Sequence, residues 1–155
     1  MEPAETKESE MKMTVFALAL LCACGLQAAE YQKILFLGNS ITLHGPNKKI
    51  GWEGNWGMAA SSQDKDYAHR VTQALKKKDG AAPEALIKNI ATFERQYATY
   101  DATELLKETA AFKADLIVVA IGENAPGLAT EEAKTRFKDS VVKLLNDIRG
   151  DGKPT

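Results

Sequence analysis

Two polar residues that follow apolar runs are the strongest candidates for chemistry in this sequence. Ser40 lies shortly after the apolar run in "ILFLGNSITLHGP" (34–46), and Asn124 follows the run 115–121 in "AIGENAP". A serine hydroxyl can attack a carbonyl carbon, and an amide N–H can stabilise the oxyanion that forms. Each residue alone also suits an ordinary turn, and Ser40 could cap a following helix. If the two residues lie at equivalent ends of neighbouring strands, together they indicate a site for acyl transfer.

Three segments predict the strands that would position these residues. They are 33–37 (KILFL), 85–90 (ALIKNI) and 115–121 (DLIVVAI). The first and third are continuously apolar, which is typical of strands buried on both faces of a parallel sheet. Ligands bind beyond the carboxyl ends of such strands. Ser40 and Asn124 would therefore face the same crevice if their strands are neighbours.

Helical patterns alternate with these strands. Motifs with capping-box character predict one helix from 61–64 (SSQD) to Lys77 and another opening at 101–104 (DATE). A third helix is predicted over 130–149, with Gly150 placed to end it. The alternation predicts one α/β domain with a parallel sheet and helices on its faces.

The sequence around both candidate residues resembles the SGNH or GDSL-like hydrolases. "GNSIT" is similar to that family's first motif, usually G-D-S, with Asn39 in place of the aspartate. "GEN" (122–124) is similar to its G-x-N-D motif, with Ala125 in place of the aspartate. The resemblance extends from residue 33 to about residue 150 and includes the order of the elements.

The resemblance implies a flavodoxin-like, three-layer α/β/α fold and a serine esterase mechanism that needs no cofactor. It assigns Ser40 as the nucleophile, and it assigns the Ser40 backbone N–H and the Asn124 side chain as oxyanion donors. A third donor in the family is a glycine after the second strand. The corresponding segment here, "NIATFERQY" (89–97), contains no glycine, so another backbone amide would have to replace that donor.

The general base is the part of this machinery that the sequence does not supply. The family places its histidine in a late D-x-x-H motif, whereas this chain ends at "RGDGKPT", where a further strand is expected. We therefore interpret 30–155 as a partial domain, truncated after its third strand and helix. Asp66 and His69 spell D-x-x-H inside a predicted helix, which we interpret as coincidental, and nothing visible orients His44. The alternative function is a catalytically inactive, glycan-binding α/β module.

The long irregular stretch 43–60 contains the candidate substrate-binding residues Trp52, Asn55 and Trp56. Exposed indoles suit stacking on sugar faces, but both tryptophans could equally plug the loop onto the domain. The family that the chain resembles is rich in carbohydrate esterases. We therefore expect a glycan or small-molecule ester as partner, with removal of acetyl or similar acyl groups from a carbohydrate.

The apolar segment 13–29 (MTVFALALLCACGLQAA) is too short for a comfortable membrane span. It predicts that 1–29 is a secretory or lipoprotein signal behind an over-extended start. "LCAC" resembles a bacterial lipobox with Cys24 as the lipidated residue; otherwise a signal peptidase would cut among 25–29. The expected protein is exported: periplasmic, secreted, or attached to a membrane only through a lipid on Cys24. The alternative is a buried N-terminal helix.

Bulk composition excludes two classes of function. The 155 residues carry a net charge of -1, with 45% hydrophobic and 26% charged residues, so no electrostatic field attracts nucleic acid. Both cysteines, Cys22 and Cys24, lie in the expected signal, and the two histidines are far apart in sequence. These residues make a poor metal site, and none is expected.

Overall fold

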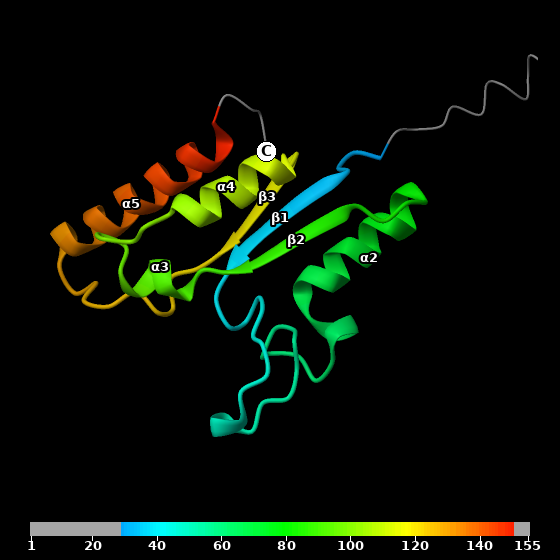
Figure 1. The fold of residues 1–155 in the computed structure, drawn as a ribbon, viewed down its shortest axis with the longest axis horizontal. Coiled ribbons are helices and arrows are strands. Elements are labelled where there is room, and N and C mark those ends of the chain that lie inside the picture. Colours follow the sequence, from blue (N-terminus) through cyan, green and yellow to red (C-terminus); the bar gives the residue numbers. More distant parts are fainter. Residues whose placement is uncertain (1–28, 151–155) are drawn as a thin grey trace, which may run out of the picture.

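The computed structural model describes residues 29–150 (Figure 1). In this part, one parallel sheet has the order β2-β1-β3 and consists of β1 (Lys33–Gly38), β2 (Glu84–Asn89) and β3 (Leu116–Ala120). The helices are α2 (Tyr67–Asp79), α3 (Ala91–Arg95), α4 (Thr103–Phe112) and α5 (Glu131–Arg149). The prediction of an α/β, flavodoxin-like arrangement with a parallel sheet is confirmed.

Strand β1 is the centre of the sheet because it pairs with both other strands. Leu35 is in register with Leu86 of β2 on one side and with Ile117 of β3 on the other. Its continuously apolar sequence suits this position, since both faces of the strand are covered. Four consecutive side chains, Ile34 to Leu37, are completely buried.

The two faces of β1 contribute to two separate cores. Ile34 and Phe36 pack with Ala68 of α2, whereas Leu35 and Leu37 pack with residues of α3, α4 and α5. Successive strand residues point to opposite faces, so this two-residue period sorts the side chains between the layers. Figure 1 shows the same division, with α2 on one side of the sheet and α4 and α5 on the other.

Helix α2 begins later than the sequence predicts. The expected capping box at 61–64 is wrong: residues Gln63–Lys65 form a separate 3₁₀ turn, and Ser62 makes no side-chain cap bond. The cap is Asp66, whose carboxylate accepts a hydrogen bond from the His69 N–H at 2.8 Å. Asp66 is only 3% exposed and also accepts from the Gly57 N–H, so tertiary contacts select it over the exposed Ser61.

The other helices agree with the sequence to within about two residues, apart from one that it does not predict. Helix α5 begins after Thr130, whose side chain accepts from the Ala133 N–H, and it is followed by Gly150. Helix α4 begins at Thr103, and the Asp101 carboxylate accepts from the Thr103 N–H at 2.9 Å. The five-residue helix α3 was not predicted, and it proves important for the candidate site.

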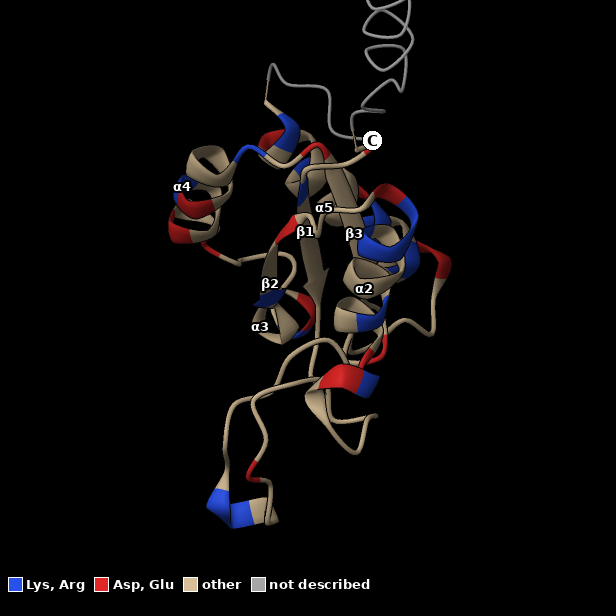
Figure 2. Cartoon of the chain, turned by 90° about the vertical axis from the view of Figure 1, so that its right-hand side faces the viewer, with Lys and Arg blue, Asp and Glu red and all other residues tan. Residues whose placement is uncertain are grey.

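Residues of both charge signs occur on the helices, with basic residues gathered on α2 (Figure 2), and the net charge is small. No helix within the described part is long and apolar enough to span a bilayer. The expected signal over 1–29, including Cys22 and Cys24, lies outside the described residues except for residue 29. Export and lipidation therefore stay predictions.

Candidate active site

The turns that follow β1 and β3 lie side by side at the carboxyl edge of the sheet. Gly38 is in register with Ala120, so Ser40 and Asn124 lie two and four residues beyond the same paired position. The turns are joined directly, because the Asn39 Nδ2 donates a hydrogen bond to the Glu123 Oε2 at 2.6 Å. The neighbouring strands that the acyl-transfer interpretation requires are therefore present.

The Ser40 turn is held by its own backbone and by close packing. Asn39 is 1% exposed; its Oδ1 accepts from the Ile41 N–H at 3.0 Å, and its carbonyl accepts from the Thr42 N–H. A Cβ on Gly38 would lie 1.8 Å from the Thr42 Oγ1, so only glycine fits there. The Ser40 carbonyl accepts from the Met58 N–H at 2.9 Å, which ties the turn to the long loop.

Ser40 itself is half-buried. Among residues 29–150, neither its hydroxyl nor its backbone N–H makes a hydrogen bond. A hydroxyl and an N–H held on a fixed turn can meet an incoming carbonyl group, the first as nucleophile and the second as oxyanion donor.

Asn124 is oriented by a residue that the sequence did not indicate. The carboxylate of Glu94, in α3, accepts from the Asn124 Nδ2 at 2.8 Å and from the Gly122 N–H at 2.5 Å. Glu94 is 0% exposed, which is unusual for a carboxylate. The only sequence signal for it was its position directly after the apolar Phe93 in "ATFER". The segment after β2, where the family resemblance predicts a glycine, forms this helix.

On the α2 side of the turn, Tyr67 adds a second polar contact. Its hydroxyl lies 2.8 Å from the Thr42 Oγ1. Burial raises the pKa of Tyr67; the Thr42 hydrogen bond opposes this shift, and the negative charges of Asp66 and Glu123 add to it. The phenol is therefore a neutral hydrogen-bonding group at ordinary pH.

Neither histidine in the described part bonds to Ser40. The His69 Nδ1 donates to the Asp66 carboxylate at 2.8 Å, and its Nε2 lies 2.9 Å from the Gln63 Nε2. The D-x-x-H spacing thus does form an aspartate–histidine pair, in the first turn of α2, where Asp66 is also the helix cap. The His44 Nδ1 lies 2.6 Å from its neighbouring carbonyl, that of Gly45.

The loop 43–60 is ordered by its two tryptophans. Two isolated bridges, His44 with Trp56 and Asn47 with Trp52, make it a hairpin-like projection with a 3₁₀ turn, Lys48–Ile50, at its tip. The indoles pack edge to face with their ring centroids 5.4 Å apart. A Cβ on Gly54 would collide with both indoles.

Both indole N–H groups of this pair are used inside the loop. Trp52 donates to the His44 carbonyl and Trp56 to the Ala60 carbonyl, each at 3.0 Å. Both rings remain half-buried and Asn55 is exposed. The tryptophans therefore have a structural role, and contact with sugars stays a prediction for Trp52, Asn55 and Trp56.

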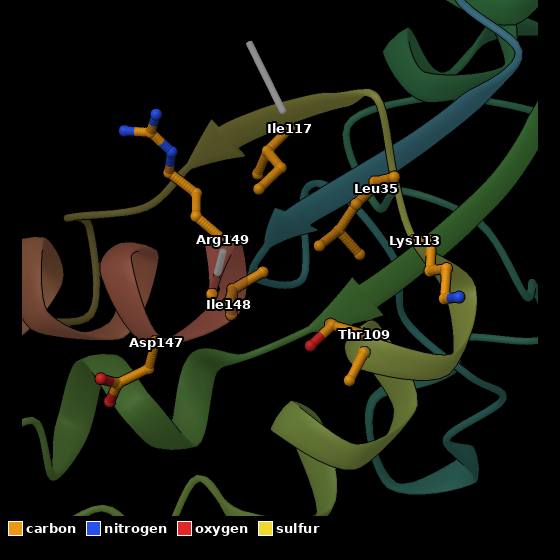
Figure 3. A pocket seen from close by; sticks show the side chains of 10 residues that line it. Leu35, Thr109, Lys113, Ile117, Asp147, Ile148 and Arg149 are labelled. Carbon is orange, nitrogen blue, oxygen red and sulfur yellow. The ribbon is translucent and has the colours of Figure 1, made fainter. Parts of the chain in front are cut away.

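A cavity of about 360 Å³ lies between the sheet, α4 and the end of α5 (Figure 3). Leu35 and Ile117 point into it from the strands, and Thr109 and Ile148 line it from α4 and α5. It is mainly apolar, and Ser40, Asn124 and Glu94 are not among the residues that line it. A smaller cavity lies between α3 and α5, lined by residues that include Tyr97 and Ser140.

No group of three or more His, Cys, Asp or Glu side chains in the part of the chain that the structure describes could hold a metal ion.

Comparisons with protein-family models, with curated proteins and with solved structures found no match to this chain.

Proposed function

We propose that this chain carries the nucleophile and oxyanion donors of an exported, SGNH-type serine ester hydrolase. The observation that supports this most is the joined pair of turns at the carboxyl edge. They hold Ser40, with a hydroxyl free of hydrogen bonds within the described part, beside the turn that carries Asn124. The resemblance of "GNSIT" and "GEN" to the family motifs points to the same two residues.

In the proposed reaction, the Ser40 Oγ attacks the carbonyl carbon of an ester while a general base accepts the hydroxyl proton. The Ser40 N–H and the Asn124 amide donate to the oxyanion. The alcohol then leaves with a proton returned by the base. Water attacks the acyl-serine, which releases the carboxylic acid and restores Ser40. The base is not assigned to a residue of this chain.

The proposed substrate is an acylated carbohydrate, with acetyl as the simplest acyl group. Its support is the loop 43–60, whose half-buried indoles stand on a projection attached to the Ser40 carbonyl through Met58. Aromatic side chains near polar groups suit sugars, which have apolar faces and hydroxyl edges.

One observation favours a second function, glycan binding without hydrolysis. Both imidazoles of the described part have other partners: His69 bonds to Asp66, and His44 bonds to Gly45. A serine without a positioned base loses most of its catalytic power, but the residues around Ser40 and the loop 43–60 could still bind a ligand.

Labelling with a p-nitrophenyl phosphonate, followed by mass spectrometry, tests the proposal. Because the base is not assigned within this chain, imidazole is added as the general base. Under these conditions the wild-type chain and a Ser140→Ala control, also half-buried but on α5, should form an adduct that Ser40→Ala abolishes. Absence of an adduct, with an acetylated oligosaccharide still shifting the backbone NMR signals of the Ser40 turn and the loop 43–60, would support the binding module. Absence of both would refute both functions.

A further inference from the structure

We propose that Glu94 is the positioning residue for the oxyanion donor Asn124. This inference rests on the proposed function, since it concerns how that site is organised. Glu94 acts through the Asn124 carboxamide and the turn 122–124, and it does not contact the substrate.

The side-chain hydrogen bonds of Glu94 all go to the turn after β3. Its Oε1 accepts from the Gly122 N–H at 2.5 Å and from the Asn124 N–H at 3.3 Å, and its Oε2 accepts from the Asn124 Nδ2 at 2.8 Å. A carboxylate has only acceptors, so it can satisfy these three donors together. A glutamine could not, because its own NH₂ group would face an N–H donor.

This contact fixes which way the Asn124 amide points. A carboxamide is planar, and its nitrogen carries two hydrogens. One is directed at the Glu94 Oε2, and the other has no acceptor among the described residues. The plane and direction of that second N–H are therefore set by Glu94, and a preset donor is what oxyanion stabilisation requires.

The location of Glu94 in the fold suits a positioning role. It follows β2, whereas Asn124 follows β3, and these strands lie on opposite sides of β1. The carboxylate therefore joins the turns of the two outer strands beyond the end of the strand that leads to Ser40. Gly122 has a φ of +133°, a backbone conformation that side chains disfavour, and Glu94 binds its N–H directly.

Direct participation of Glu94 in chemistry is disfavoured by its environment. It is 0% exposed, so a substrate cannot reach it without a rearrangement. As a carboxylate it cannot donate to an oxyanion, and its negative charge would oppose one. A buried charge is expensive unless its hydrogen bonds are complete, as they are here. Its contribution is therefore to geometry.

The test compares Glu94→Gln with Asn124→Ala, the double variant and the control Glu104→Gln, an exposed carboxylate on α4. The rate of phosphonate adduct formation at Ser40 should fall at least ten-fold in Glu94→Gln and remain unchanged in the control. Because Glu94 acts through Asn124, the double variant should be no slower than Asn124→Ala alone. The Asn124 side-chain NH₂ signals in ¹⁵N NMR should move toward random-coil positions in Glu94→Gln.

A wild-type labelling rate in Glu94→Gln, or rate losses that multiply in the double variant, would overturn the inference while the proposed function stands. If wild-type Ser40 forms no adduct, the proposed function fails, and the NMR signals decide about Glu94 separately. Unchanged Asn124 NH₂ signals in Glu94→Gln would then overturn its positioning role, and displaced signals would support it. If Glu94→Gln does not fold, Glu94→Asp, which keeps the charge on a shorter side chain, takes its place in each comparison.

Discussion

Replacing Asn39 with aspartate, the residue usual in the family motif, should destabilise this protein. Asn39 is both acceptor and donor: its Oδ1 accepts from the Ile41 N–H at 3.0 Å, and its Nδ2 donates to the Glu123 Oε2 at 2.6 Å. Aspartate keeps the first bond and loses the second. It places a carboxylate oxygen against the Glu123 carboxylate at a position that is 1% exposed.

The magnitude follows from three effects. Loss of a hydrogen bond to a charged group costs about 1.5–3 kcal/mol. Repulsion between the two carboxylates adds to this cost. Glu123 is exposed, however, and can swing into water, which screens the repulsion. We expect a net loss of about 2 kcal/mol in the free energy of unfolding at pH 8, which lowers a urea midpoint by about 1 M.

The loss should depend on pH with a definite sign. Burial and the neighbouring Glu123 raise the folded-state pKa of the new aspartate above its unfolded value of about 3.9. A group of this kind favours folding below its unfolded pKa, and the benefit is lost as pH rises through the folded pKa. The Asn39→Asp deficit should therefore be small near pH 4 and largest above pH 7.

Urea denaturation followed by circular dichroism at pH 4 and pH 8 measures this deficit. The matched rescue is Asn39→Asp with Glu123→Gln, in which the glutamine NH₂ donates to the new carboxylate and restores the pairing with its direction reversed. The reasoning is refuted if Asn39→Asp is as stable as wild type at pH 8. It is equally refuted if the double variant is no more stable than the single one.

Three further predictions concern the surroundings of the site. Gly38→Ala should lower the free energy of unfolding by about 1–3 kcal/mol or more, and the melting temperature with it, because its Cβ would lie 1.8 Å from the Thr42 Oγ1. Gly45→Ala, with its nearest contact at 3.9 Å, is the tolerated control. Burial raises the pKa of Tyr67, so the absorbance difference at 295 nm between wild type and Tyr67→Phe should titrate above pH 10. The stability that the neutral phenol contributes should fall as pH rises through that pKa. A titration midpoint at or below 10.0 contradicts this prediction. Trp52→Phe should remove the exciton band that the edge-to-face indole pair produces near 230 nm in circular dichroism, without changing the helical signal; an unchanged band would show that the pair is absent in solution.

The sheet was predictable because β1 and β3 can each be recognised from the apolar residues of the strand itself. The continuously apolar segments 33–37 and 115–121 indicated strands buried on both faces, and the observed β1 and β3 agree with them to within one residue at each end. The end of β2 was misplaced by one residue, because Ile90 turns into α3 while its N–H still donates to the Gly38 carbonyl.

What the sequence could not show depends on contacts between distant segments. Ser61 and Asp66 are both plausible helix caps locally, and only burial against Gly57 decides between them. Glu94 lies in a five-residue helix, too short for a periodic pattern, and its partners are about 30 residues away. The Asp66 and His69 spacing was visible, but only the fold shows that their side chains pair.

The central place of β1 has a consequence for the motions of this protein. Its backbone is hydrogen-bonded on both sides, so its amides should exchange with solvent only when the whole domain opens. Ser40 lies two residues beyond this strand, whereas the tryptophan hairpin of residues 44–56 projects from the body and packs largely on itself. We therefore expect the amides of the hairpin to exchange through local openings that leave the position of Ser40 unchanged. Under the proposed function, substrate contact at the hairpin and reaction at Ser40 would then have separate timescales.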